Sequence, residues 1–193
     1  SDESIENRWK NFQAEAYKRI TENKGAITNI IGLGTYLIVH TEKSMFVFNV
    51  DNTLKTQDKD VQMLMPDVFD VNYQEVFATE RGLAGFQDFI SYSVGRYGYI
   101  FYDKNAQVIY RYDNNTISEL TTGIINYIRS KNIKHIYIGE DSVRDRLLFN
   151  FIDDEDNSNI LSYNLVNNNW LSAHSYTSNY PFISMKDLSL IHI

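Results

Sequence analysis

The chain has 193 residues, 43% of them hydrophobic, which suffices for one or two domains with a buried core. Its 25 acidic and 18 basic residues give a net charge of -7, and no basic run offsets it, so the composition argues against nucleic-acid binding. The longest apolar stretches, such as YLIVH from Tyr36, fall far short of the roughly 20 residues that a membrane helix needs, so no membrane partner is expected.

Two further features of the composition limit the chemistry. The chain contains no cysteine, which excludes disulfides and thiolate metal sites. Its first residues, SDESIENRWK, are acidic and polar where a secretory signal peptide would be basic and then apolar. The sequence therefore predicts no signal peptide.

The N-terminal residues 1–25 have the pattern of an amphipathic helix. Apolar residues recur at steps of three or four, which places them on one helical stripe: Ile5, Trp9, Phe12, Ala16 and Ile20. Gly25 is a typical residue at which such a helix ends. The stripe packs either on the body of this protein or on another chain, and in the second case Ile5, Trp9, Phe12 and Ala16 are the candidate partner interface.

Residues 26–193 are predicted to be mainly β. Two prolines, fourteen tyrosines and eleven phenylalanines are present, and aromatic and β-branched residues gather in short runs typical of strands. Between residues 50 and 86 the pattern weakens, and a short helix is expected at VNYQEVFA, residues 71–78. Strands are predicted at 35–41, 44–50, 88–93, 97–103, 107–113, 116–121, 135–139, 145–152, 160–166 and 170–176, with one or two more in 182–193.

The strands repeat with a period near 50 residues. Tyr110 and Tyr163 lie 53 residues apart (163 − 110), as do Ile117 and Trp170, and candidate first strands recur near Tyr36, Phe89, His135 and Leu188. Such a period, with four strands per unit, is typical of a β-propeller blade, whose sheet stacks against its neighbours. We therefore predict propeller-like blades of four-stranded antiparallel sheets.

The predicted ring is incomplete. Propellers have typically four to eight blades, whereas this pattern contains two clear blades, a fragment of a third at the start and one further first strand at the end. Because open stacking faces would expose large apolar patches, another chain or a missing portion completes the ring, or the strands pack as a sandwich. The last strand either pairs with strands near Tyr36 or is completed by a neighbouring polypeptide, as in a ring of many copies, and the second alternative is favoured.

No catalytic, cofactor or metal site is predicted. GLG at residues 32–34 precedes a strand rather than a helix, which differs from a dinucleotide fingerprint. The four histidines are not paired at zinc-site spacing. Asp154, Asp156 and Ser158 alternate like the first ligands of a calcium loop, but the glycine and glutamate of an EF-hand are missing, so a solvated hairpin tip is favoured over a weak calcium site.

Two kinds of sugar chemistry stay open. The fold determines the separation of the two carboxylates that glycoside hydrolysis needs, so the sequence leaves such a pair open. The candidates near first-strand ends, where propeller pockets form, are Glu80, Asp88, Glu140 and Asp141. Ordinary surface charge is the favoured interpretation for each. Aromatic residues at loop ends could stack on a carbohydrate. The candidate ligand contacts are Tyr97, Trp170 and Tyr176.

Two segments resemble a known family. LGTYLIVHTEKSMFVFNV, and ERGLAGFQDFISYSVGRYGYIFYDKNAQVIYRYDNNTISELT after it, resemble the propeller-like tail proteins of short-tailed phages, namely the muzzle proteins of crAss-like phages and the related tail accessory, or stabilisation, proteins. The shared pattern is a small Gly/Ala turn, a first strand, a strand like YIFYD, then VIYRYDNN and a closing strand. It extends from about Ile30 to the end.

The resemblance implies a structural, non-enzymatic virion protein in the tail below the portal. Its partners would be other copies of itself and other phage tail proteins, and its role would be tail assembly, genome retention or host contact. Members of the family are much longer than this chain, so the chain would be a piece or a short member. The alternatives are a carbohydrate-binding propeller that recognises a host surface glycan, and a glycoside hydrolase.

Overall fold

The computed structural model describes residues 19–20, 23–49, 53–55, 60–62 and 73–177. The candidate interface of the predicted N-terminal helix, Ile5, Trp9, Phe12 and Ala16, lies outside these residues, and so do the strands predicted in 182–193. Arg19 and Ile20 are not helical and residues 23–24 form a turn, so the helix does not continue to Gly25 as predicted.

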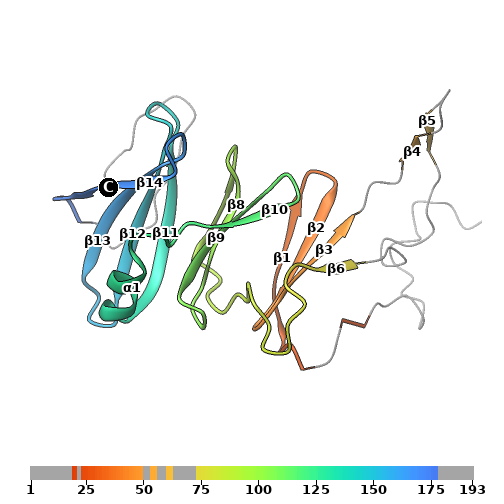
Figure 1. Ribbon diagram of the computed structural model, residues 1–193, viewed down its shortest axis with the longest axis horizontal. Helices are drawn as coiled ribbons and strands as arrows, with labels where there is room; N and C mark the ends of the chain where they lie inside the picture. Colours follow the sequence, from red (N-terminus) through yellow and green to blue (C-terminus); the bar gives the residue numbers. More distant parts are fainter. Residues whose placement is uncertain (1–18, 21–22, 50–52, 56–59, 63–72, 178–193) are drawn as a thin grey trace, which may run out of the picture.

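Three four-stranded antiparallel sheets form the described body, and they lie side by side along its long axis (Figure 1). We call them blades 1, 2 and 3. Blade 1 contains β1 (Ile27–Leu33), β2 (Tyr36–Thr41), β3 (Met45–Asn49) and β6 (Tyr73–Glu75). Blade 2 contains β7 (Tyr92–Gly95), β8 (Gly98–Asp103), β9 (Val108–Asp113) and β10 (Thr116–Glu119). Blade 3 contains β11 (Ile133–Asp141), β12 (Arg146–Asp153), β13 (Ser158–Asn164) and β14 (Asn169–His174).

Each blade is a meander in which consecutive strands pair. The order in blade 3 is β11-β12-β13-β14, and blades 1 and 2 follow the same rule. In blade 1 a separate hairpin, β4 (Thr53–Lys55) and β5 (Asp60–Gln62), interrupts the chain between β3 and β6. The prediction of mainly β structure in blade-like, four-stranded antiparallel sheets without a closed ring is confirmed.

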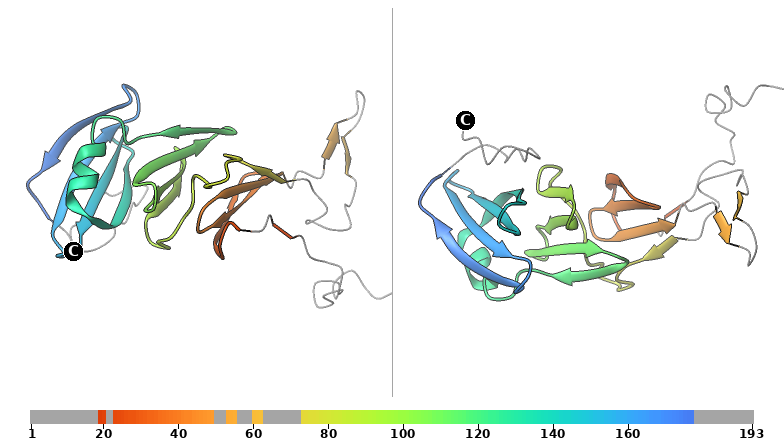
Figure 2. Two further views of the ribbon diagram at one scale, coloured as in Figure 1. Left: turned by 60° about the horizontal axis from the view of Figure 1, so that its bottom comes forward. Right: turned by 90° about the horizontal axis from the view of Figure 1, so that it is seen from above.

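Apolar cores between the sheets hold the blades together. Blades 1 and 2 bury Ile38 and Met45 from one sheet against Tyr99 and Phe101 from the other. Blades 2 and 3 share a second core, whose buried side chains include Ile100, Tyr102, Ile109, Leu147, Phe149 and Phe151. Successive residues of β8 thus point to opposite faces, because side chains alternate along a strand. Figure 2, in the view from above, shows the middle sheet between the other two.

Tyr110 and Tyr163, which are 53 residues apart, face the same way but are not at equivalent register positions. Tyr110 packs in the core shared with blade 1 and Tyr163 in the core shared with blade 2, so each faces the preceding blade. However, Tyr163 pairs with Trp170 one position from the hairpin turn, and in blade 2 the residue that pairs with Ile117 there is Tyr112. The equivalent of Tyr163 is therefore Tyr112, because the turn after β13 is longer than the turn after β9.

Three predictions about the secondary structure of blades 1 and 2 were wrong. Blade 1 is complete rather than a fragment, because its first strand begins at Ile27 and Tyr36 already belongs to β2. Within the helix expected at residues 71–78, Tyr73–Glu75 instead form the edge strand β6, which pairs with β3. The first strand of blade 2 begins at Tyr92, whereas Phe89 lies in the preceding turn and is 76% exposed.

The helix α1 (Ile125–Lys131) was not predicted. It has no side-chain hydrogen bond at its N-terminal cap, and Asn132 ends it in a left-handed conformation with φ 48°. Its single fully buried residue, Ile128, packs into the core between blades 2 and 3. With one buried position in seven residues, the segment shows little helical periodicity in the sequence.

Candidate functional site

A pocket of about 340 Å³ opens between blades 1 and 2. Strands of blade 1 and the hairpin β9–β10 of blade 2 contribute its walls. The lining residues are Tyr36, Val47, Asn49, Gln74, Val76, Tyr112, Asn115 and Ile117. A volume above 300 Å³ at the junction of two sheets is within the range of small-molecule sites.

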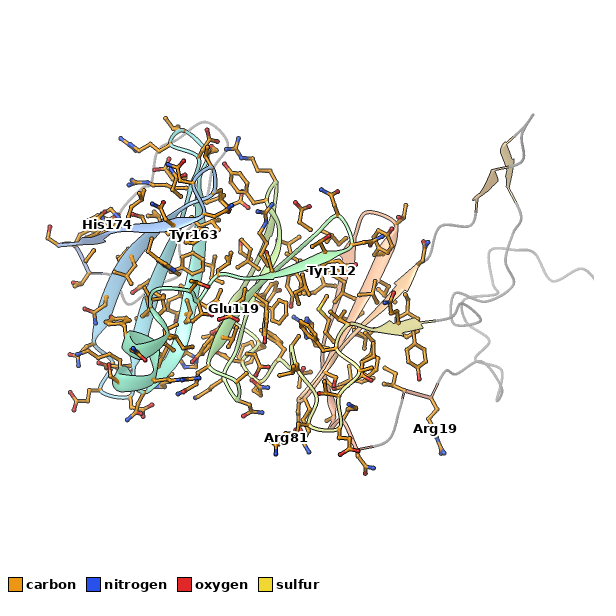
Figure 3. The ribbon with its side chains drawn as sticks, in the orientation of Figure 1. Arg19, Arg81, Tyr112, Glu119, Tyr163 and His174 are labelled. Carbon is orange, nitrogen blue, oxygen red and sulfur yellow. The ribbon has the colours of Figure 1, made fainter. Side chains whose placement is uncertain are left out.

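Two consecutive side-chain hydrogen bonds cross this pocket from one blade to the other. The Tyr112 hydroxyl donates to Oδ1 of Asn115 at 3.0 Å, and Nδ2 of Asn115 donates to the Tyr36 hydroxyl at 2.7 Å. Burial raises the pKa of Tyr112, so its hydroxyl stays protonated and remains a donor. Figure 3 shows Tyr112 on the part of blade 2 that is turned toward blade 1.

The local sequence explains why Asn115 is in place. Asn114 and Asn115 form the two-residue turn between β9 and β10, with φ of 47° and 60°. A two-residue hairpin with positive φ at both positions is a type I′ turn, which favours asparagine and glycine. The turn therefore fixes the Asn115 backbone, and its amide side chain reaches blade 1 from there.

The pocket has the chemistry of a binding site rather than of a reaction centre. Its apolar lining residues are Val47, Val76 and Ile117, and amides and tyrosine hydroxyls supply the polar atoms. None of its lining side chains carries a charge at neutral pH. The pocket thus offers hydrogen-bond donors and acceptors for a neutral ligand.

Trp170, a predicted ligand contact, belongs instead to the core between blades 2 and 3. Its ring centroid lies 5.0 Å from that of Phe149 and 5.1 Å from that of Tyr163, and Nε1 donates to the Leu120 carbonyl at 2.9 Å. The half-buried ring therefore joins the two blades. An indole with its N–H satisfied inside the protein is a packing residue at this position.

The other two predicted ligand contacts are Tyr97 and Tyr176. The Tyr97 hydroxyl donates to Oδ1 of Asp145 at 2.9 Å, and the Arg96 guanidinium lies 4.4 Å from the centre of its ring. The ring of Tyr176 lies 5.0 Å from that of His174, beyond β14. Tyr97 and Trp170 both pack against the core between blades 2 and 3.

A second hollow, of about 590 Å³, lies where the first strands of the three blades meet. Its lining includes three exposed apolar residues: Ile30 from β1, with 57% exposure, and Tyr92 and Val94 from β7, with 37% and 43%. Tyr137 and Ile138 contribute from β11. We call this hollow the inner groove.

Asp88 is one of the four carboxylates considered for sugar chemistry, for which ordinary surface charge is favoured. Oδ2 of Asp88 accepts two hydrogen bonds, one from the Ser91 hydroxyl at 2.5 Å and one from Nδ1 of His135 at 2.6 Å. Because the Ser91 hydroxyl points at Asp88 rather than at His135, these three side chains do not form a nucleophile–base relay. Ser91 also accepts from the backbone N–H of Ile136, which links blade 2 to β11.

Asp141 and Glu140 differ in their electrostatics. Burial tends to raise the pKa of Asp141, but hydrogen bonds from Arg146 and Arg144 hold that pKa below its ordinary value. Burial raises the pKa of Glu140, and the nearby Arg96 opposes this effect. Glu80, the remaining candidate, is exposed in the loop before β7.

The acidic turn between β12 and β13 is a hairpin tip, as the sequence favoured. Asp156 pairs with Lys134 at 3.1 Å, and Ser158 donates to Asn150 at 2.7 Å, so these two side chains do not converge on one point. Among the described residues, no group of three or more His, Asp or Glu side chains could hold a metal ion. Within the same residues, no helix is long and apolar enough to cross a membrane.

Comparison of the chain with protein-family models and with curated proteins found no match. Sequence reasoning missed the pocket because its lining comes from four separate segments of the chain. Two features of the sequence repeat did point to the pocket. The Asn-Asn pair occurs in both repeats, and the small Ile117 stands where the other repeat has the large Trp170.

Proposed function

We propose that the chain is a structural protein of a phage virion, located in the tail, in a muzzle or accessory assembly below the portal. It acts by assembly with other copies of itself and with other tail proteins, in genome retention or host contact, and carries out no catalysis. Both segments that resemble this family lie in blades: the first covers β2 and β3, and the second covers β7 to β10.

The observation that carries this proposal is the inner groove. Ile30, Tyr92 and Val94 line it, and all three are exposed large apolar residues. Soluble monomers rarely expose contiguous apolar patches, and such patches usually mark interaction surfaces. The first strands β1, β7 and β11 are also edge strands, so their free backbone edges can pair with another chain.

The number of blades supports the same proposal. The described residues form three four-stranded sheets, and three blades are fewer than the four to eight of a propeller. Further blades, supplied by other chains, would complete a ring.

Sedimentation velocity of the chain and of two groove variants tests the proposal. Ile30→Glu and Val94→Glu place a charge in the groove at exposed positions, so each should change the free energy of unfolding by less than about 0.5 kcal/mol. We expect the unmodified chain to sediment as an oligomer, and both variants to sediment as smaller species. Val143→Glu is the matched control, because Val143 is 79% exposed in the turn between β11 and β12, outside the groove.

A monomeric chain, or equal oligomers for all variants, would contradict assembly through the groove. The virion location is tested separately by mass spectrometry of purified particles from the culture that carries the gene. We expect the chain at a constant ratio to the portal protein. Its presence in lysate but not in particles would overturn the tail assignment.

A further inference from the structure

The interfaces between successive blades use equivalent positions, which allows a direct comparison of the two. Ile117 of β10 pairs with Tyr112, and Trp170 of β14 pairs with Tyr163, each one position from the hairpin turn. Both side chains face the preceding blade. Ile117 and Trp170 are therefore the same position of two blades.

The same comparison applies on the facing sheets. Val47 of β3 pairs with Ile38 and Gln74, and Arg111 of β9 pairs with Ile100 and Ser118. Ile38 and Ile100 each face the following blade, so Val47 and Arg111 also occupy equivalent positions. The first interface thus has valine and isoleucine where the second has arginine and tryptophan.

This difference in size explains where the pocket lies. At the second interface the Trp170 ring packs on Phe149 and Tyr163 and donates to Leu120, so the space is filled. At the first interface the smaller Val47 and Ile117 line an opening of about 340 Å³. The first interface therefore has small side chains at two positions where the second interface has the large side chains of Arg111 and Trp170.

We propose that this pocket binds one uncharged saccharide ring. The apolar lining residues Val47, Val76 and Ile117 suit the C–H face of a sugar. Gln74 and Asn115 add amides to the lining, and an amide has both donors and acceptors, as hydroxyl groups require. A charged ligand would find no opposite charge among the lining side chains and would lose its hydration without compensation.

The hydrogen bonds among Tyr112, Asn115 and Tyr36 orient the polar groups of the pocket. Asn115 uses Oδ1 and one hydrogen of Nδ2 for Tyr112 and Tyr36, so its second Nδ2 hydrogen can still donate to a ligand. Because Tyr36 accepts from Asn115, its own hydroxyl hydrogen can be directed to a ligand oxygen. The site thus has two oriented donors before a ligand arrives, which reduces the entropic cost of binding.

Saturation-transfer difference NMR tests this inference on the full chain. The probes are the methyl glycosides of glucose, galactose, mannose and N-acetylglucosamine, with N-acetylneuraminic acid as the anionic comparison. We expect saturable transfer to at least one neutral glycoside and none to the anionic sugar. The responding sugar is then presented at the end of an immobilised glycan, and binding there distinguishes a glycan terminus from a free sugar as the source.

Ile117→Trp is the decisive variant, because it copies the filled interface. We expect it to weaken binding of the responding glycoside at least about tenfold while the chain stays folded. Val166→Trp is the matched control, since it adds the same ring at a position that is 74% exposed in the turn after β13, and it should bind as the unmodified chain does. If Ile117→Trp does not fold, Asn115→Gly replaces it, because glycine keeps the positive φ and removes the amide.

Three results would overturn the inference: no transfer to any neutral glycoside, transfer to the anionic sugar of equal strength, or unchanged binding in Ile117→Trp and in Asn115→Gly. These outcomes are independent of the sedimentation of the groove variants. A monomeric chain that binds a glycoside would contradict the proposed assembly but not the sugar site.

Discussion

Asp103 and Asp153 occupy the same position in successive blades, at the end of the second strand, and each holds the following turn by its carboxylate. Asp103 accepts from the backbone N–H groups of Asn105 and Ala106, both at 3.1 Å. Asp153 accepts from Glu155 at 3.0 Å and from Asn157 at 2.8 Å. An aspartate that accepts from backbone N–H groups two to four residues onward is the usual way to fix such a turn.

The two carboxylates should have opposite effects on stability as the pH falls. Burial raises the pKa of Asp103 in spite of its hydrogen bonds, so its protonation favours the folded state, and this contribution is lost as the pH rises through the folded pKa. Hydrogen bonds from the side chain and backbone of Asn157 lower the pKa of Asp153, so its contribution is present above the unfolded pKa and is lost as the pH falls through the folded pKa.

We therefore expect Asp153→Asn to reduce the loss of stability below pH 4, and Asp103→Asn to increase it. Urea unfolding at several pH values between 2.5 and 7 measures both slopes. Slopes that change in the same direction for the two variants would contradict the difference in their surroundings.

Trp170 should contribute to stability rather than to ligand binding. Trp170→Ala removes a ring that packs between two blades, and we expect a loss of about 3 kcal/mol. Trp170→Phe keeps an aromatic ring but loses the hydrogen bond to Leu120, and should cost about 1 kcal/mol. Urea unfolding gives both values. Two equal losses would show that the ring itself is unimportant.

The sequence predicted the strands that have large continuous apolar runs, and it missed both edge strands of blade 1, β1 and β6. β8, β9 and β12 bury aromatic residues on one face or both, and their patterns were recognised. β6, with the sequence YQE, pairs on one side only, so it needs few apolar residues and was mistaken for part of a helix. β1 has a largely exposed pattern for the same reason, since it is the edge strand of blade 1.

The binding pocket was beyond sequence reasoning for a different reason. Tyr36, Gln74 and Asn115 meet only after blade 1 has stacked on blade 2, and no local pattern records that contact. Aromatic residues at strand ends were taken as exposed ligand contacts, yet Trp170 fills the space between two blades. Whether an aromatic residue binds or packs is decided by what the neighbouring blade places opposite it.

Ser91 should be important for the joint between blades 2 and 3. Its buried hydroxyl accepts from Ile136 and donates to Asp88, so Ser91→Ala leaves two polar groups without this partner. We expect a loss of about 2 kcal/mol in the free energy of unfolding. The control is Ser130→Ala, because Ser130 is exposed and bonds only within its own helix turn, to Tyr127. Similar losses for the two variants would show that the joint does not depend on Ser91.

His40 is fully buried between blades 1 and 2. Its ring centroid lies 4.6 Å from that of Phe101 and 5.4 Å from that of Phe86. Since a carbonyl oxygen can only accept, Nδ1 donates to Ala84 at 3.1 Å and the neutral ring has its second nitrogen, Nε2, buried without a hydrogen-bond partner among the described residues. Burial lowers the pKa of His40 to about 3, although the bond to Ala84 acts in the opposite direction.

A folded pKa below the ordinary value of 6.5 makes the unfolded chain the better proton acceptor between pH 6.5 and about 3. Stability should therefore be complete above pH 6.5 and fall by up to about 1.4 kcal/mol for each pH unit below it. His40→Asn should remove this part of the slope, because the amide can still donate to Ala84 but does not titrate. His174→Asn, at a half-buried position on β14, should leave most of the slope in place. If the His40→Asn chain loses stability as steeply as the unmodified chain between pH 6 and pH 4, His40 is not the group that responds.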